Sequence, residues 1–298
     1  MVRPAAFGFN PKTASSNHFQ KESPGNGDLQ KLVLKEFDDM VELLKSKGIR
    51  IIVFEDTIEP VKPDAIFPNN WLSTTSEGMM HVFPMYASNR REEKRDDILH
   101  SLTNEFIVND VLDWTEYEAE NMFLEGTGSM VMDHQNRIIY ACLSGRTHKA
   151  MVEKFAATNG YKAIVFNAND VNGHPIYHTN VMMCIGEGFA VLCPKAITDD
   201  TERIAVAQLL ETTGHENIYI THEQMNAFAG NMLHVKTSTG KRIIVLSRTA
   251  HEALTLNQLE RLNNYGELLP INVSTIEQGG GSVRCMMAEI FLHSKFKE

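Results

Sequence analysis

Gly160-Tyr161-Lys162-Ala163-Ile164-Val165-Phe166 is the clearest copy of a pattern that recurs along the chain, a helix stop followed by a short apolar strand. A helix ends most easily at Gly or Asn, because these residues adopt the left-handed backbone conformation at low cost. Four more copies begin at Gly48, Asn104, Gly214 and Gly266, with strands expected over 49–54, 105–108, 216–220 and 267–271. The stops lie about 52 to 56 residues apart, and such a period indicates an internally repeated architecture.

Helical spacing of apolar residues precedes the stops, and further strand patterns lie between the helices. The first helical stripe consists of Leu29, Leu32, Val33, Phe37, Met40, Val41 and Leu44. A shorter stripe consists of Ile204, Val206, Ala207, Leu209 and Leu210. Additional strands are expected over 79–83, 137–142, 189–192 and 242–246. One unit therefore holds several strands and one helix.

Five such units fill residues 1–298 and leave no room for a separate domain, so we expect a single α/β domain. A closed ring of units is favoured because it leaves few exposed sheet edges. An open α/β sheet with two lobes is the alternative.

Composition excludes several classes of protein. The chain is 43% hydrophobic and 22% charged, and no stretch approaches the roughly 20 apolar residues of a membrane helix. A formal charge of −10 argues against nucleic acid or an anionic membrane as a partner. The first residues lack an apolar signal core, and the four cysteines form no CxxC pair. We therefore expect a cytoplasmic protein without a disulfide framework or a zinc site.

Near the C-terminus the chain reads Gly279-Gly280-Gly281-Ser282-Val283-Arg284-Cys285-Met286-Met287. Three glycines allow the backbone to approach a ligand closely. Ser282 is expected to cap a helix over 283–292, with Cys285 in its first turn, where the positive helix end favours thiolate over thiol. The segment suits a nucleophile, and a buried, inert cysteine is the alternative.

Three other segments gather polar side chains at expected strand ends or in loops. They are Pro63-Asp64 to Asn69-Asn70-Trp71, Leu124-Glu125-Gly126-Thr127-Gly128, and His174 to His178-Thr179-Asn180. Each has a structural alternative: Asp64 or Asn70 capping a turn, Glu125 as a solvated charge, and His178 as a core histidine. A metal pair of His174 and His178 is disfavoured, because Pro175 opposes the helix that would align them. Together, Cys, His and a carboxylate are the minimum set for covalent thiol catalysis.

These motifs, with Ser144-Gly145-Arg146-Thr147, occur in an order that resembles the guanidine-modifying, or amidinotransferase, superfamily. That superfamily includes arginine deiminase, dimethylarginine dimethylaminohydrolase, succinylarginine dihydrolase and glycine amidinotransferase. The chain is most similar to a bacterial amidinotransferase-like branch proposed to hydrolyse citrulline. The resemblance spans Asp64 to Cys285 and implies the pentein fold, a five-bladed α/β propeller of ββαβ-type units with pseudo-fivefold symmetry.

The resemblance also implies roles for individual residues. Cys285 is expected to attack the head-group carbon of the substrate, His178 to act as general acid and base, and Glu125 to hold and orient the head group. Substrate contacts are expected from Asp64, Asn69, Asn70, Arg90, Arg146 and Asn180, with the two arginines gripping an α-carboxylate. The mechanism requires neither a metal nor an organic cofactor, because the thiolate supplies the covalent step.

Asn70 departs from many relatives, which carry Asp at this position. An amide both donates and accepts hydrogen bonds, so it suits a neutral ureido group better than a second carboxylate would. The sequence therefore predicts a hydrolase of arginine- or citrulline-like small molecules, with conversion of citrulline to ornithine favoured. An amidinotransferase, a non-catalytic binding propeller and a papain-like protease are alternatives, and a homodimer is left open.

Overall fold

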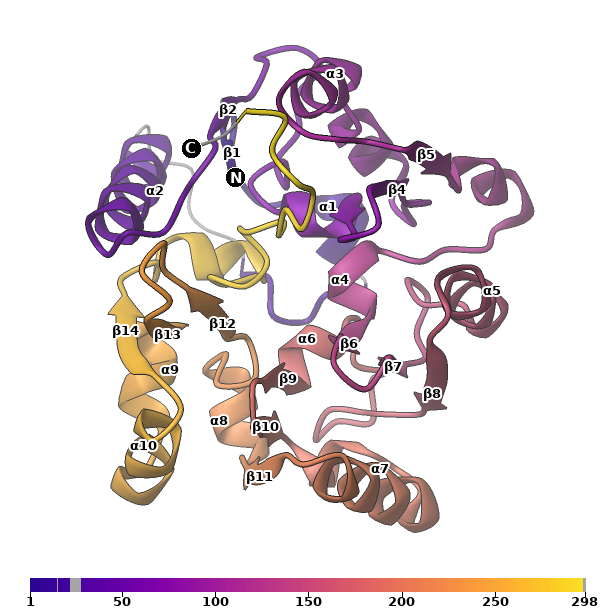
Figure 1. The fold of residues 1–298 in the computed structure, drawn as a ribbon, viewed down its shortest axis with the longest axis vertical. Coiled ribbons are helices and arrows are strands. Elements are labelled where there is room, and N and C mark those ends of the chain that lie inside the picture. Colours follow the sequence, from indigo (N-terminus) through magenta and orange to yellow (C-terminus); the bar gives the residue numbers. More distant parts are fainter. Residues whose placement is uncertain (15, 22–27, 297–298) are drawn as a thin grey trace.

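The computed structural model describes residues 1–14, 16–21 and 28–296, which form five small β-sheets with helices at their outer ends. Figure 1 shows these sheets arranged around the centre of the molecule, with α2 (Leu29–Ser46), α3 (Asp96–Glu105), α5 (Lys149–Asn159), α7 (Asp200–Thr212) and α10 (Leu256–Asn263) at the rim. The α/β class expected from the sequence is confirmed.

Four of the sheets share one topology: the first two strands are antiparallel, and the third, reached through a helix, is parallel to the second. In chain order their strands are β3 (Leu72–Thr74), β4 (Met79–Val82) and β5 (Asp110–Asp113); β6 (Val131–Asp133), β7 (Ile138–Cys142) and β8 (Lys162–Phe166); β9 (Met183–Gly186), β10 (Phe189–Leu192) and β11 (Glu216–Tyr219); and β12 (Leu233–Lys236), β13 (Arg242–Ser247) and β14 (Glu267–Ile271). The helices that connect the second and third strands are α3, α5, α7, and α9 (Arg248–Ala253) together with α10.

The fifth sheet is smaller than the sequence predicts. It pairs β1 (Val2–Arg3) in parallel with β2 (Phe54–Glu55), and α2 connects the two strands. Among the described residues this sheet has two strands, so the expectation of five equal units is met by four of them. Most of the strand expected over 49–54 is extended chain without a ladder partner.

The strand expected over 105–108 is also misplaced, because β5 begins only at Asp110. Phe106 instead forms an isolated bridge with Ser294, and the Ile107 amide donates to the His293 carbonyl at 2.8 Å. The C-terminal segment therefore takes the hydrogen bonds that a sheet partner would have supplied.

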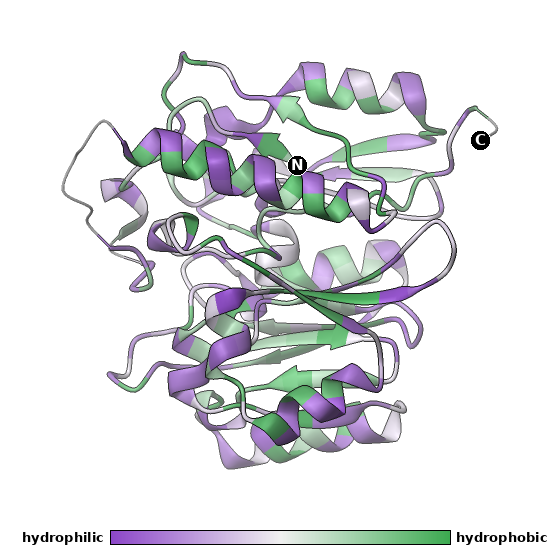
Figure 2. Cartoon of the chain, turned by 90° about the vertical axis from the view of Figure 1, so that its left-hand side faces the viewer, coloured by the Kyte–Doolittle hydropathy of each residue, from purple (hydrophilic) through white to green (hydrophobic). Residues whose placement is uncertain are grey.

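The helix stops follow the predicted chemistry at three positions. Gly48, Gly160 and Gly214 have φ values of 77°, 68° and 91°, in the left-handed region that favours glycine. The stripe on α2 is buried through Val33, Phe37, Met40, Val41 and Leu44, whereas Leu32 is 51% exposed. Figure 2 shows the same alternation, with hydrophobic strands inside and helices of mixed hydropathy outside. No helix among the described residues is both long and apolar enough to cross a bilayer.

His81, in β4, is a buried histidine that links stability to pH. Trp114 Nε1 donates to His81 Nδ1 at 3.2 Å, and burial lowers the pKa of His81 from 6.5 to about 4. The unfolded chain therefore binds this proton more readily than the native protein does. The stabilisation is present above about pH 6.5 and is lost as the pH falls from 6.5 towards 4.

We expect acidification from about pH 7 to about pH 5 to cost about 2 kcal/mol of unfolding free energy through His81 alone. The His81→Gln variant keeps an acceptor for Trp114 but does not titrate, so it should lose this part of the acid sensitivity. Urea unfolding of both proteins at the two pH values measures the difference. Equal pH dependence of the two proteins would contradict the assignment.

Candidate active site

Five turns meet at the centre of the molecule (Figure 1), and four of them lead into the first strand of a three-stranded sheet. Three are the short helices η1 (Pro68–Asn70), α4 (Gly126–Ser129) and α6 (Thr179–Met182), and the other two contain Asn231 and Cys285. Hydrogen bonds join them in sequence order. Thr127 Oγ1 donates to Asn69 O (3.3 Å), Thr179 Oγ1 to Ser129 O (2.6 Å), Asn231 Nδ2 to Asn180 O (2.9 Å), and Arg284 N to Asn231 Oδ1 (3.1 Å). We call these five segments the central turns.

A small cavity lies over the central turns. It is lined by Asn17, Asp64, Phe67, Asn70, Arg90, Arg146, Tyr177, His178, Gly279, Gly280, Gly281 and Cys285. Six of the nine residues expected at the site line it; the other three, Asn69, Glu125 and Asn180, do not. The nucleophile and acid–base candidates therefore share one cavity, although 107 positions separate them in sequence (285 − 178).

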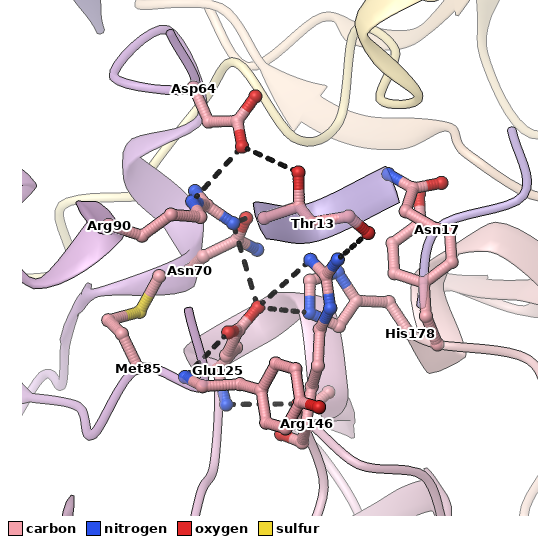
Figure 3. Close-up of polar contacts among 12 residues, drawn as sticks. Thr13, Asn17, Asp64, Asn70, Met85, Arg90, Glu125, Arg146 and His178 are labelled. Carbon is pink, nitrogen blue, oxygen red and sulfur yellow. Dashed lines mark hydrogen bonds and ion pairs between the residues drawn. The ribbon is translucent and has the colours of Figure 1, made fainter. Parts of the chain in front are cut away.

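Glu125 is the polar centre of the site (Figure 3). Its Oε2 accepts hydrogen bonds from His178 Nε2 at 2.8 Å and Arg146 at 3.4 Å, and its Oε1 accepts the Tyr86 amide at 3.0 Å. Burial alone would raise the pKa of Glu125, but Arg146, His178 and Arg90 outweigh burial and hold the pKa well below its usual range. Both oxygens thus accept hydrogen bonds within the protein, and Glu125 contacts His178 without lining the cavity.

His178 is neutral at physiological pH. Burial lowers its pKa to about 4, and the Glu125 carboxylate acts in the opposite direction without cancelling that effect. Because a carboxylate only accepts, Nε2 must carry the hydrogen, which leaves Nδ1 as the nitrogen that gains and loses a proton. Gly128 packs against this ring: a Cβ there would lie 2.8 Å from Nδ1 and 2.4 Å from Asn70 Nδ2. The Gly-Thr-Gly sequence after Glu125 therefore makes room for both side chains.

Arg90 and Arg146 both line the cavity, and each is paired with a buried carboxylate. Arg90 forms two 2.8 Å bonds to Glu93 and donates to Asn70 Oδ1 at 3.0 Å. Arg146 pairs with Glu125 and lies over the ring of Tyr177, 5.0 Å from its centroid. Buried cations of this kind persist only when paired.

Asp64 and Asn70 line the cavity with unpaired atoms, whereas Asn69 does not reach it. Asp64 Oδ2 is taken by Asn10 at 2.8 Å, but Asp64 Oδ1 and Asn70 Nδ2 are buried and have no hydrogen-bond partner among the described residues. Asn69 donates to Thr127 Oγ1 at 3.3 Å behind the cavity. The cavity thus offers one carboxylate acceptor and one amide donor to a ligand.

The helix expected over 283–292 does not form. Residues 283–286 make a turn, in which the Cys285 amide donates to Ser282 O at 2.9 Å. Ser282 is not a cap, because its hydroxyl donates to Glu277 Oε1 at 2.7 Å. Gly280 has a φ of 80°, and its carbonyl accepts the Tyr177 hydroxyl, so the glycine run bends sharply before the cysteine. A helix dipole therefore cannot activate the sulfur.

Amide groups contact the cysteine instead. The Cys285 sulfur accepts hydrogen bonds from Asn180 Nδ2 at 3.5 Å and from Asn231 Nδ2 at 3.3 Å. Asn180, expected to bind substrate, thus contacts the candidate nucleophile and does not line the cavity. Asn231 was missed; its position after Gly230, just before an apolar strand, matches that of Asn70 before β3 and could have identified it.

An N-terminal segment that the sequence did not single out covers the site. Asn10 and Thr13 contact Asp64, Ser16 accepts a 2.8 Å bond from Arg146, and Asn17 donates to Gly280 O at 3.3 Å. Figure 3 shows Thr13 and Asn17 facing the cavity residues. The clustering of Asn, Thr and Ser in this N-terminal segment is the sequence feature that could have identified it.

His174 lies apart from the cavity. It is stacked on His18, with ring centroids 4.1 Å apart, and contacts Asp170 at 3.3 Å. His178 instead faces Glu125, so the two histidines do not converge on one point.

Comparison with known proteins agrees with this architecture. The family model described as "N,N dimethylarginine dimethylhydrolase, eukaryotic" matches residues 3–292. No match was found among curated proteins.

Solved structures share the fold at low sequence identity. The N-terminal domain of ArgZ, an arginine dihydrolase of the ornithine–ammonia cycle in cyanobacteria, was solved as a mutant bound to substrate; it is 15% identical, with a TM-score of 0.71 over 96% of this chain and 95% of that one. A second ArgZ mutant, covalently bound to a reaction intermediate, has 15% identity and a TM-score of 0.72 over 100% and 97%.

A dimethylarginine dimethylaminohydrolase mutant carrying an S-methyl-L-thiocitrulline adduct is 15% identical, with a TM-score of 0.63 over 96% of both chains. These likenesses establish the fold. With the family match over residues 3–292, they show that the chain belongs to the N,N dimethylarginine dimethylhydrolase family of C–N hydrolases, in the pentein amidinotransferase-like superfamily.

Proposed function

We propose that this protein is a cysteine-dependent hydrolase of the guanidinium or ureido group of arginine- or citrulline-like small molecules, with citrulline as the favoured substrate and ornithine as the product. The observation that carries the proposal is that Cys285 and His178 line one small cavity together with Asp64, Asn70 and two paired arginines. A nucleophile, a proton carrier and fixed polar contacts are what covalent thiol hydrolysis requires.

In the proposed reaction the Cys285 thiol gives its proton to His178 Nδ1, and the sulfur bonds to the ureido carbon of citrulline. The bond from that carbon to the chain nitrogen breaks, and the nitrogen leaves as the amine of ornithine with a proton from His178. His178 then takes a proton from the water that attacks the S-linked carbamoyl group, and passes this proton to the departing sulfur. The free thiol and carbamic acid are released, and carbamic acid breaks down to carbon dioxide and ammonia. Glu125, bonded to His178 Nε2 at 2.8 Å, fixes the ring during both transfers.

Hydrogen-bond chemistry favours a neutral head group. Asp64 Oδ1 can accept a substrate N–H, and Asn70 Nδ2 can donate to an oxygen. A ureido group has both N–H donors and an oxygen acceptor, whereas a guanidinium has only donors and would leave the Asn70 donor unpaired. The other lining charges, Arg90 and Arg146, are cationic and suit the α-carboxylate of an amino acid.

We further infer that the five sheets are the blades of a pentein propeller. The two-stranded sheet of β1 and β2 then stands for the fifth blade, and residues 287–290 after Cys285 occupy the place of its missing first strand. The four buried cysteines, none in a disulfide, suit the cytoplasm that we propose as the location. A homodimer stays a prediction.

Replacing the nucleophile gives the most direct kinetic test. Cys285→Ser should lower kcat for citrulline by about 10⁴-fold or more, because a hydroxyl is a much poorer nucleophile than a thiolate. Ammonia and ornithine release measure the rate, and circular dichroism confirms the fold. Substantial turnover by the folded variant would remove the mechanism, and a product that forms only when glycine or ornithine is added as acceptor would instead indicate a transferase.

Glu125→Gln tests the orientation of His178. Losing the carboxylate removes the influence that raises the pKa of His178, so this pKa should fall below about 4. The acid limb of kcat/KM should therefore move to lower pH, and kcat should fall by about 100-fold. The pH–rate profiles of the two proteins give both values. An acid limb that moves to higher pH would be inconsistent with this role.

Asn70→Asp tests the preference for a neutral head group. A second carboxylate should favour guanidinium, raising the ratio of kcat/KM for arginine to that for citrulline by about tenfold. Asn69→Asp is the matched control, because Asn69 does not line the cavity; it should leave this ratio unchanged whatever it does to the rate. If both variants change the ratio equally, Asn70 does not set the preference.

A further inference from the structure

The Cys285 sulfur lies in an unusual environment for a nucleophile. The turn over 283–286 gives it no helix N-terminus. Within the described part of the chain, the side chains that hydrogen-bond to it are the amides of Asn180 and Asn231. Neither amide carries a charge, so these two contacts offer a sulfur anion N–H dipoles. Charged and titratable side chains that line the same cavity act beside them, namely Asp64, Arg90, Arg146, Tyr177 and His178.

The orientation of the Asn231 amide is fixed by its backbone partners. Its Oδ1 accepts the Arg284 amide at 3.1 Å, and its Nδ2 donates to the Asn180 carbonyl at 2.9 Å. A flipped amide would set NH₂ against the Arg284 N–H and oxygen against the Asn180 carbonyl, and both contacts would be repulsive. The second N–H of Nδ2 therefore remains for the sulfur, 3.3 Å away.

The fold holds Asn231 tightly in this place. Its side chain is fully buried. Gly230, just before it, packs against α6: a Cβ on Gly230 would lie 2.3 Å from Val181 O. A glycine there is what lets the turn containing Asn231 approach the turn containing Asn180. The donor is thus preorganised before any substrate arrives, as electrostatic stabilisation requires.

We propose that Asn231 and Asn180 form a pair of amide donors that stabilises the Cys285 sulfur as an anion, with Asn231 as the fixed member of the pair. This inference rests on the proposed function, in which the sulfur attacks as a thiolate. An anion accepts both N–H groups, whereas a neutral thiol is a weak acceptor. The thiol can instead donate to Asn231 Oδ1, but this contact is longer, at 3.7 Å against 3.3 Å for the Nδ2 donor, so the pair favours the ionised form. Asn231 also ties the backbone of Arg284 to the adjacent turn, and so positions the sulfur.

Thiolate absorbance near 240 nm, titrated against pH without substrate, tests the inference. Each protein is compared with its own Cys285→Ser counterpart, so that the difference reports Cys285. The other cysteines do not interfere at neutral pH, because burial raises the pKa of Cys142 and of Cys184 to about 12 and that of Cys193 to about 11.

Asn231→Asp keeps the size of the side chain but puts a carboxylate beside the sulfur. The midpoint of the Cys285 titration should move to higher pH by about one unit or more, which is about tenfold less thiolate near pH 7. In Asn231→Ser the side chain is too short to reach the sulfur, so the midpoint should also move to higher pH. This variant replaces Asn231→Asp in the test if Asn231→Asp does not fold. Asn159→Asp is the matched control: its amide also donates to a backbone carbonyl, that of Phe155 at 2.9 Å, but lies outside the cavity lining.

An unchanged midpoint in a folded Asn231 variant, or an equal change in Asn159→Asp, would overturn the inference. Because the titration uses no substrate, its outcome is separate from the proposed function. A raised midpoint in a protein that hydrolyses none of the tested substrates would support the amide pair and reject the proposed activity. Hydrolysis of citrulline by a protein whose Cys285 midpoint is unchanged in the Asn231 variants would support the proposed activity and reject the amide pair.

Discussion

The close meeting of the central turns is the constraint on which the rest of the structure depends. Four of the turns lead into the first strand of a sheet, and hydrogen bonds from Thr127, Thr179, Asn231 and the Arg284 amide join one turn to the next. Side chains at the ends of these turns are therefore forced toward one point. His178 and Cys285 come from different units, and the meeting of the central turns brings them into one cavity.

Burial then governs the chemistry of that point. Glu125 is surrounded by Arg146, Arg90 and His178, and it stays ionised because these groups outweigh the cost of burial. His178 stays neutral because burial outweighs the carboxylate. A neutral imidazole beside a fixed carboxylate can take up a proton and return it, which suits a reaction that uses one residue first as acid and then as base.

Local chemistry explains which features the sequence could predict. The stops at Gly48, Gly160 and Gly214 and the strands that follow Gly160 and Gly214 are encoded within a few residues, by a left-handed turn and an apolar run. Long-range contacts explain why two expected elements, the strand over 105–108 and the helix over 283–292, did not form. Residues 105–108 lost their expected strand to the C-terminal segment, and residues 283–286 form a turn that is tied to Asn231 through the Arg284 amide. Neither partner is visible in the local sequence.

The candidate site also has features that the sequence predicted and features that it did not. Motif order was enough to bring together Asp64, Asn70, Arg90, Arg146, His178 and Cys285, all of which line the cavity. It could not give the orientation of side chains, so Glu125 and Asn180 were expected to face substrate but contact His178 and Cys285 without lining the cavity. The N-terminal contacts of Thr13 and Ser16 join segments about 130 residues apart, a separation at which pattern carries no information.

The central claim is that the sulfur of Cys285 forms a covalent bond with the head-group carbon of the substrate. It is tested most directly by acid-quenching the protein during turnover of citrulline labelled at its ureido carbon and locating the label by peptide mass spectrometry. The account predicts label on the peptide that contains Cys285, appearing before product and disappearing as substrate is consumed. Turnover with no labelled peptide at any time, or label on a different residue, would contradict it.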